Sequence, residues 1–486
     1  MLNYISKPKS LKISAVKNKY HSLMPSEFRV VSIQNNNTNK LSEFCESENV
    51  GEQIEVTKYL SFCTKNFLAT ISCMGGLILD ETKGENIPPL VYKDSSRKLH
   101  KGHYVISRNA SLGKIAYINS DTNIILNGGI SYLKFKKEYE FYAPVFFIVN
   151  YGADYLTCIT SGGGTQQNAK RDTLLSVPIP LPTISNHFRP NDIITFVSIL
   201  VQNIIHKEEE INRKNILIDK MIEDELNNNQ KNEKYYYTLP KISEVKNTLT
   251  KLDTGVYSTK FKALDFLVKN YLGGFELMDT YVINLKSGST PNFFEKKTGD
   301  FPFFVRPTEF NANRTYESLR KIHFNKDIAK HRVDVEAGII LPRKGGVNAI
   351  LKPEGFPVIV GDSVKFGTFK NINIGFLASF LTSNLIKSQL EKIKSKTNGG
   401  SLTETNLRNL PIPNFSPSKQ HEIAFEYYNP VTNNSNLILE NYLTLEFERN
   451  KSLGIFQLNM EILELKEKLA NVIDKIIKNQ EIQINL

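Results

Sequence analysis

One phrase occurs twice in this chain, as TSGGGTQQNAKRDTLLSVPIPLP at residues 160–182 and as KTNGGSLTETNLRNLPIPNF at residues 396–415. Each copy has neighbouring glycines, then hydroxyl and amide side chains, an arginine, a leucine and a Pro-Ile-Pro ending. A pattern this specific, repeated at long range, indicates an internal duplication. The distance between the copies then sets the size of the repeated unit.

The duplication extends upstream of the phrase. KGHYVISRNASLGKIAYI (101–118) and EAGIILPRKGGVNAILK (336–352) each contain a glycine, an apolar run, an arginine, a Gly-containing turn and a second apolar run. Arg108 and Arg343 lie 235 residues apart, and the two Pro-Ile-Pro segments lie 233 residues apart. Landmarks at nearly one offset predict two similar domains.

A long helical segment follows each copy. Residues 191–229 contain neither proline nor glycine, and residues 436–480 carry an apolar seam in steps of three and four. The two helices are expected to pair, and Gly454 is expected to kink or interrupt the second. The alternative is that each is an amphipathic helix lying on a globular core. The predicted pairing positions are Ile204, Ile211, Ile218, Ile462, Leu465, Leu469, Val472 and Ile476.

Short β-branched and aromatic runs alternate with turns and helical pieces in the remaining sequence. The expected fold class is therefore mixed α/β (α+β), with two similar domains separated by two long antiparallel coiled-coil helices. Pro-Ile-Pro is expected to end each domain and to lead rigidly into the long helix. The predicted boundaries are 1–185 for the first domain, 186–231 for the first long helix, 232–414 for the second domain and 415–486 for the second long helix.

The composition favours an anionic partner. Among 486 residues, 61 are Lys or Arg and 50 are Asp or Glu, which gives a net charge of +11. The four cysteines show no CxxC spacing and predict reduced thiols. No signal-peptide core opens the sequence and no apolar run is long enough to span a bilayer, so we expect a cytoplasmic protein with no membrane partner.

No stretch of the sequence has the pattern of a catalytic site. The glycines at 162–164 lack the frame of a phosphate-binding loop, and Ser111 with Lys114 forms an isolated SxxK. NPVT (429–432) lacks the second proline and the aromatic ring of an adenine methyltransferase loop. We expect no catalytic residue, no metal and no cofactor in this chain, although an enzyme with an unrecognised active site stays an open alternative.

The repeated phrase suits a loop that faces DNA. Glycines allow close backbone approach, amides and hydroxyls donate and accept hydrogen bonds, and Lys or Arg pairs with phosphate or reads guanine. The alternative is a helix start with Thr165 or Ser401 as N-cap. The two interpretations are compatible, because a helix N-terminus also binds phosphate.

Several segments together resemble the DNA-specificity subunits of type I restriction–modification systems. They are SGSTP (287–291), GDFPFFVRPTEFN (299–311), the R-x-x-G elements around Arg343 and more loosely Arg108, LDTGVYSTKFKAL (252–264) and the two GG…L…PIP phrases. The resemblance covers most of the chain. The first half departs from it, because it has no SGSTP and carries NASLGK after its arginine.

The resemblance implies that each of two target-recognition domains reads one half of a bipartite site in double-stranded DNA. The long helices would fix the gap between half-sites, and two methyltransferase (modification) subunits would dock on them. S-adenosylmethionine would belong to the methyltransferase partner, and ATP with Mg²⁺ to the restriction subunits. Open alternatives are a catalytically silent scaffold or decoy, and a specificity partner of a fused methyltransferase–nuclease.

The residues that we predict to contact DNA come from both copies. They are Arg108, Asn109, Ser111, Lys114, Thr165, Gln166, Gln167, Lys170, Arg171, Ser289, Thr290, Arg306, Thr308, Arg343, Lys344, Asn348, Asn398, Ser401, Thr403 and Arg408.

Overall fold

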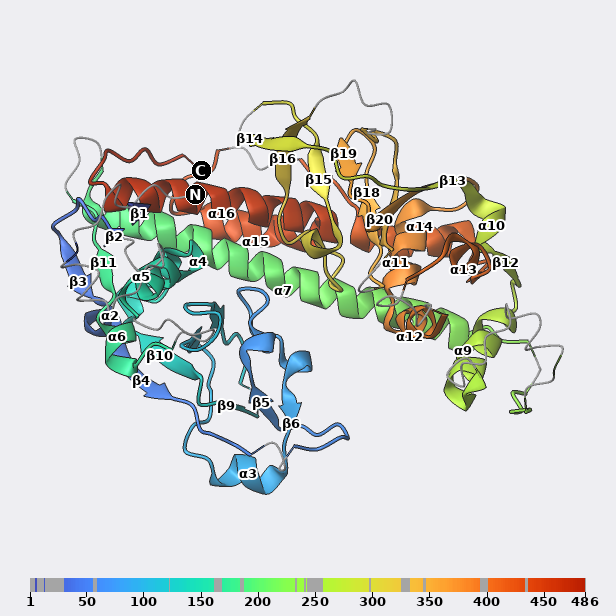
Figure 1. Cartoon of the computed structure of the whole chain (residues 1–486), viewed down its shortest axis with the longest axis horizontal. Helices are drawn as coiled ribbons and strands as arrows, with labels where there is room; N and C mark the ends of the chain where they lie inside the picture. Colours follow the sequence, from blue (N-terminus) through green and yellow to red (C-terminus); the bar gives the residue numbers. More distant parts are fainter. Residues whose placement is uncertain are drawn as a thin grey trace. The chain divides into compact units, whose positions relative to one another are not determined.

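The computed structural model of the chain describes residues 5–6, 13, 30–55, 59–121, 123–160, 168–183, 188–231, 234–239, 242, 257–296, 299–324, 333–343, 347–393, 401–432 and 436–485. These residues form a mixture of helices and strands, as predicted (Figure 1). The chain divides into two compact units. Unit 1 comprises Met1–Glu209, Asn433–Asn450 and Glu461–Leu486, and unit 2 comprises Glu210–Thr432 and Lys451–Met460.

Unit 1 is built on two small sheets of short apolar strands. One sheet has the order β4 (Cys45–Val50), β10 (Ile130–Phe135), β7 (Tyr104–Ser107) and β8 (Ile115–Tyr117), and all its pairs are antiparallel. The other has the order β6 (Glu85–Asn86), β5 (Phe67–Ala69) and β9 (Ile124–Leu126), with β5 parallel to β9. Side chains from both sheets, among them Val105 and Leu126, share one core.

Unit 2 repeats this arrangement. Its antiparallel sheet has the order β13 (Val282–Ser287), β20 (Val364–Phe369), β17 (Gly338–Pro342) and β18 (Ile350–Lys352). Its second sheet has the order β14 (Phe293–Lys296), β16 (Arg320–Phe324), β15 (Phe303–Val305) and β19 (Val358–Val360), with β15 parallel to β19.

Strand pairing in the two units keeps the same register. Ser131 of β10 lies opposite Val50 and Ile106, whereas Lys365 of β20 lies opposite Ser287 and Leu341. These three positions are offset by 234 to 237 residues. The duplication predicted from the sequence is therefore confirmed strand by strand.

Pro-Ile-Pro forms a short strand in both units. β11 (Pro178–Pro180) pairs with β3 (Thr38–Lys40), and β21 (Pro411–Pro413) pairs with β12 (Phe275–Leu277), both antiparallel. Proline has no N–H to donate, so each of these strands is restricted to a two-stranded ladder. The expectation that Pro-Ile-Pro leads directly into the long helix was wrong for unit 2, because the short helix α14 (Pro417–Tyr427) follows β21 and α15 begins only at Tyr442. In both units the motif also pairs with an earlier strand of its own unit.

Helices surround the sheets. Unit 1 contains α2 (Leu41–Phe44), α3 (Pro89–Asp94), α4 (Val145–Ile148), α5 (Tyr151–Ile159) and α6 (Arg171–Leu175). Unit 2 contains α9 (Thr259–Lys269), α10 (Met278–Tyr281), α11 (Ile374–Thr382), α12 (Asn384–Ile393), α13 (Glu404–Arg408) and α14 (Pro417–Tyr427). α11 is buried from Gly375 to Thr382 and packs on β17 and β18.

The long helices are α7 (Pro190–Asn228), which contains 39 residues, α15 (Tyr442–Ser452) and α16 (Ile455–Ile477). α7 matches the predicted first helix. The predicted second helix is interrupted before α16, as expected at Gly454, where a Cβ atom would lie 2.4 Å from the backbone nitrogen of Asn429. No described helix is long and apolar enough to cross a membrane.

Within unit 1, α7 packs against both C-terminal helices. α16 is antiparallel to α7: Phe196 contacts Lys468, and Lys207, further along α7, pairs with Glu461, which comes earlier in α16. α15 is parallel to α7: Asn203 is hydrogen-bonded to Tyr442, and Lys207, further along α7, is hydrogen-bonded to Asn450, which comes later in α15. The predicted antiparallel pairing is therefore present between α7 and α16, and a third helix, α15, lies parallel to α7.

Most of the predicted pairing positions are buried. Leu465 is only half-buried, whereas the side chains buried in their own units are Ile204, Ile211, Ile218, Ile462, Leu469, Val472 and Ile476.

A buried ionic network joins these three helices in unit 1. Lys207, whose side chain is 1% exposed, donates hydrogen bonds to Asn450 Oδ1 and Glu461 Oε2, both at 2.5 Å. Arg449 donates to Glu446 Oε2 at 2.9 Å and to Glu461 Oε2 at 2.7 Å. Two cations thus match two carboxylates, which offsets the cost of removing each charge from water.

Candidate nucleic-acid interface

The SGSTP turn leaves the end of β13 in unit 2. Gly288 donates its N–H to Val364 O at 2.9 Å, and Ser289 donates to Val360 O at 3.0 Å. A Cβ atom on Gly288 would lie 2.1 Å from Val360 O. Only glycine fits against this carbonyl, so the turn requires a residue without a Cβ atom at this position.

Unit 1 has an equivalent turn that the sequence comparison missed. Gly51 donates to Ile130 O at 2.9 Å, Glu52 donates to Leu126 O at 2.8 Å, and a Cβ atom on Gly51 would lie 2.2 Å from Asn127 O. These bonds reproduce the pattern of the SGSTP turn. VGEQI (50–54) is thus the structural counterpart of SGSTP, although only the glycine is shared.

Arg108 and Arg343 hold matching backbone positions. Arg108 donates its N–H to Gly129 O at 2.8 Å, and Arg343 donates to Ser363 O at 2.8 Å. The carbonyl of Arg108 accepts from Ala169 at 2.8 Å, and that of Arg343 accepts from Leu402 at 3.1 Å. Both arginines therefore anchor the repeated phrase beside the central sheet.

The side chains of these two arginines differ. The guanidinium of Arg108 donates to Gly128 O at 2.6 Å and to Ala169 O at 3.4 Å, and its burial lowers its pKa. Arg343 is exposed, and its guanidinium makes no hydrogen bond or ion pair with the residues that the structure describes. Arg108 thus holds the fold together, whereas Arg343 is available to a ligand.

The charged residues of the first phrase are exposed on unit 1. Arg171 of α6 pairs with Glu48 of β4, with Nε 2.9 Å from Oε2. Lys170 is exposed beside it, and Asn109 forms a backbone bridge with Asn168. Asn168 and Arg171 of the phrase therefore lie against the segment after β7 and β4, respectively, and Arg171 already has a carboxylate partner.

The second phrase begins a short helix in unit 2. Thr403 caps α13, because its Oγ1 accepts the N–H of Asn406 at 3.1 Å. Ser401 lies two residues earlier, so the alternative that made it the N-cap was wrong. Arg408 pairs with Glu404 at 2.8 Å and with Asp279 at 2.5 Å, so this predicted DNA contact is held by two carboxylates.

The VRPTE segment encloses a buried carboxylate. The side chain of Glu309, 3% exposed, accepts hydrogen bonds from Arg306 at 2.7 Å, Arg320 at 3.1 Å and Thr308 at 3.1 Å. Burial raises the pKa of Glu309, but the bonds from Arg306 outweigh it and hold the pKa below its usual range. Arg306 and Thr308 therefore stabilise unit 2 in this structure.

The remaining predicted residues lie near the turns. Ser111 and Lys114 are exposed in the turn between β7 and β8, and Thr290 donates to Asp362 Oδ1 at 3.2 Å beside the SGSTP turn. Asn348 is half-buried, and its Oδ1 has no hydrogen-bond partner among the described residues.

Five predicted residues lie outside the described residues, and their placement stays untested. They are Thr165, Gln166, Gln167, Lys344 and Asn398.

One residue near the SGSTP turn escaped the sequence prediction. Lys365 of β20 is 6% exposed, and its Nζ donates to Ser287 Oγ at 3.3 Å. Burial lowers its pKa; Glu404 counters this effect, while Arg343 and Arg408 add to it. Alignment with Ser131 at the duplication offset could have identified this position, because unit 1 has no charge there.

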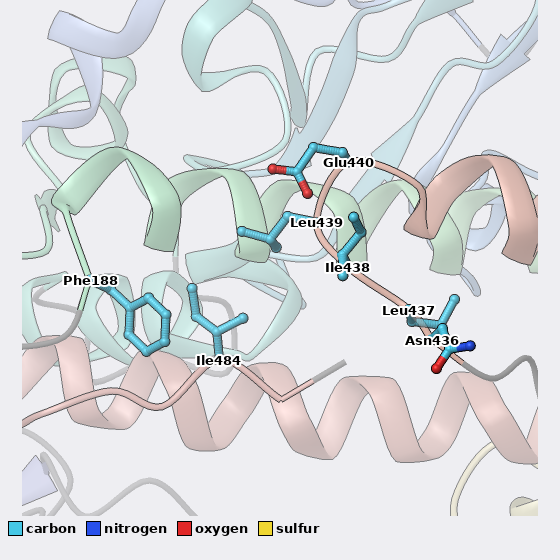
Figure 2. A pocket seen from close by; sticks show the side chains of 7 residues that line it. All are labelled: Phe188, Asn436, Leu437, Ile438, Leu439, Glu440 and Ile484. Carbon is cyan, nitrogen blue, oxygen red and sulfur yellow. The ribbon is translucent and has the colours of Figure 1, made fainter.

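A hollow of about 560 Å³ in unit 1 lies apart from these residues (Figure 2). Five of its seven lining residues are aliphatic or aromatic, and the only ionisable one is Glu440, an acid. The lining residues are Phe188, Asn436, Leu437, Ile438, Leu439, Glu440 and Ile484. Such a wall does not suit a phosphate, and the described residues contain no acidic, histidine or cysteine cluster able to hold a metal.

No protein-family model and no curated protein sequence matches this chain. Among solved structures, the S subunit of a type I restriction–modification system from M. genitalium is 14% identical, with 92% of this chain and 96% of that chain covered and a TM-score of 0.40. The HsdS subunit from Thermoanaerobacter tengcongensis is 13% identical, with coverages of 91% and 97% and a TM-score of 0.26.

A third solved structure concerns complex assembly and conformational transition of the type I R-M system. It is 13% identical, with 90% of this chain and 97% of that chain covered and a TM-score of 0.28. Each of the three alignments covers about nine tenths of this chain.

Proposed function

We propose that this chain is the DNA-specificity subunit of a type I restriction–modification complex, and that each unit reads one half of a bipartite target. The observation that supports this most is the duplication in register. The two units carry the same strand order in their four-stranded antiparallel sheets, the same glycine turn and the same arginine anchor at one offset. Two similar readers in one chain suit a target made of two half-sites.

The two readers need not recognise the same sequence. The residues after the matching glycines are Glu52 and Gln53 in unit 1 and Ser289 and Thr290 in unit 2. Carboxylate, amide and hydroxyl groups favour different base edges in the major groove. We therefore propose an asymmetric target, with different bases in its two halves.

The long helices would set the distance between the half-sites. α7 supplies residues to both units, and its 39 residues correspond to about 58 Å at 1.5 Å per residue. The buried network around Lys207 would keep this element rigid, because each member is held by at least two partners. The exposed faces of the same helices would receive two methyltransferase subunits.

The chemistry would belong to the partners. The methyltransferase subunits would supply S-adenosylmethionine for adenine methylation, and the restriction subunits would use ATP and Mg²⁺. The part assigned to this chain is recognition of DNA, to which its net charge of +11 is suited.

A change in helix length tests this proposal. Within helices, the chain passes between the units at 209/210 in α7, 450/451 in α15 and 460/461 in α16, and it also passes between them at 432/433. One heptad inserted at all three points would lengthen each helix by about 10.5 Å. At 3.4 Å per base pair, the methylated motif is expected to keep both half-sites and to gain about three base pairs between them.

The control exchanges seven native residues at each point for the same heptads without changing the length. Its motif is expected to equal that of the wild type. An unchanged gap in the lengthened protein, with methylation intact, would contradict the role of the helices as a spacer.

A further inference from the structure

The central strand of the main sheet differs between the units at one buried position. Lys365 of β20 occupies the place that Ser131 holds in β10, and the neighbour across the strand is Ser287 in place of Val50. The duplicated fold therefore does not require a lysine here. Something other than the architecture must account for a charged group at a position that is only 6% exposed.

The charge of Lys365 is not neutralised within unit 2. An ammonium has three donors, and the described residues give it one hydrogen bond, to Ser287 Oγ at 3.3 Å, and no ion pair within 4.0 Å. Glu404 acts on it only from a greater distance and is itself bonded to Arg408 at 2.8 Å. Burying an ammonium without a counter-ion is costly, so this site favours an incoming anion.

A second cation, whose side chain has no hydrogen bond or ion pair with the described residues, lies near this lysine. Arg343 is exposed directly after β17, and its backbone N–H donates to Ser363 O at 2.8 Å, two residues before Lys365, while Leu341 lies opposite Lys365. Its guanidinium can bind two phosphate oxygens at once, and the lysine can supply a point charge to the same group. Both lie at the strand ends from which the SGSTP turn also leaves.

We propose that Lys365 and Arg343 together bind one backbone phosphate of the DNA half-site that unit 2 reads. This inference rests on the function proposed above and adds the residues that position the DNA. Unit 1 lacks the site, because Ser131 is uncharged and the guanidinium of Arg108 is bound to Gly128 O. Unit 2 would therefore make one phosphate contact that has no equivalent at these positions of unit 1.

The test compares Lys365→Met with Lys286→Met in the complex of the full chain with its methyltransferase subunits. Lys286 is an exposed lysine on the neighbouring strand β13 and serves as the matched control. The probe is duplex DNA carrying the mapped methylation motif, titrated at several salt concentrations. Lys365→Met is expected to lower the slope of log Kd against log salt by about 0.9, the value for one lost phosphate contact.

Two further results are expected. The double variant Lys365→Met/Arg343→Ala is expected to lose no more slope than either single variant, because both side chains contact one phosphate. Lys365→Met is expected to unfold at the same or a higher urea concentration than the wild type, because it removes a buried unpaired charge.

Three outcomes would overturn the proposal. They are an unchanged slope, a changed preference at one base pair, which would indicate base reading, and a loss of stability parallel to the loss of binding. If the wild-type complex prefers its motif and the Lys365→Met complex binds the motif DNA with the same Kd and the same salt slope, only this proposal fails. If the wild-type complex shows no motif at all, the proposed function fails as well.

Discussion

The buried network around Lys207 allows a quantitative test of helix pairing. Lys207→Met keeps the length of the side chain but removes its charge, and it leaves Glu446 and Glu461 with Arg449 as their only cation in the network. Removing one partner from a buried ion pair costs about 3–5 kcal/mol. Because the side chain of Glu461 is still 22% exposed, we expect the lower end, about 3 kcal/mol.

Hydrogen exchange at the amides of residues 196–209 measures this effect locally. A loss of 3 kcal/mol corresponds to about a hundredfold faster exchange through unfolding of this segment. Lys220→Met is the control, because Lys220 is an exposed lysine of the same helix. Its exchange is expected to change by no more than about twofold, since exposed substitutions fall within about 0.5 kcal/mol.

A second variant separates charge from packing. Lys207→Met combined with Glu461→Gln leaves one cation and one carboxylate, so part of the lost protection is expected to return. Equal exchange in Lys207→Met and Lys220→Met would refute the reasoning, because the buried charges would then contribute nothing. No recovery in the double variant would show that the loss came from packing.

The pH dependence of the same comparison gives an independent check. Burial raises the pKa of Glu446, but hydrogen bonds from Arg449 and the charge of Lys207 outweigh it and lower the pKa overall. A carboxyl whose folded pKa is depressed stabilises the protein above its unfolded pKa of about 4.3, and this contribution is lost as the pH falls. The difference between Lys207→Met and wild type is therefore expected to shrink as the pH falls from about 5 to about 3.

Three further predictions concern the two units separately. Burial raises the pKa of Glu309, but hydrogen bonds from the neighbouring Arg306 lower it overall. In urea titrations, Glu309→Gln is therefore expected to reduce the loss of unit 2 stability that occurs in the wild type below about pH 4.3. The same loss of stability in both proteins would contradict this. Gly51→Ala is expected to destabilise unit 1 by at least about 2 kcal/mol, measured by hydrogen exchange. Gly75→Ala is expected to be nearly neutral, because its added Cβ atom would lie 3.5 Å from the nearest atom. Equal effects of the two substitutions would show that the turn has room for a side chain. Arg343→Ala is expected to weaken binding to the motif DNA without changing the bases recognised and without loss of stability, because its guanidinium is assigned to a backbone phosphate. Arg108→Ala is expected to lower the stability of unit 1; the reverse pattern in DNA titration and thermal unfolding would contradict the roles assigned to these arginines.

The regular elements could be predicted because local pattern and tertiary structure agree. The apolar runs YVIS (104–107) and GIILP (338–342) form strands, and the segment free of proline and glycine forms α7. The spacing of repeated landmarks also gave the correct alignment of the two units. In each case the signal is a periodicity or an offset, which survives changes in individual residues.

The glycine turn of unit 1 could not be predicted from a motif. VGEQI shares only Gly51 with its counterpart SGSTP, because the shared constraint is the close approach of a backbone carbonyl and not the chemistry of the flanking side chains. Such a constraint is visible only once the facing strand is in place.

The roles of the arginines could not be predicted from the sequence either. Arg108 and Arg343 have the same backbone bonds, yet one guanidinium is satisfied by carbonyls of its own unit and the other is exposed. Arg306 and Arg408 looked like candidate DNA contacts, but each lies beside a carboxylate. Lys365 went unnoticed because a lysine in an alternating strand is ordinarily solvated, and only its place in the sheet shows that it is buried.

The most direct test of the central claim is a genome-wide map of N6-methyladenine in cells that express this chain with its methyltransferase subunits. The proposed function predicts one motif, with two short and different half-sites at a fixed gap. Methylation without a bipartite motif, or a stable complex that methylates nothing, would contradict the claim that the two units of this chain read DNA.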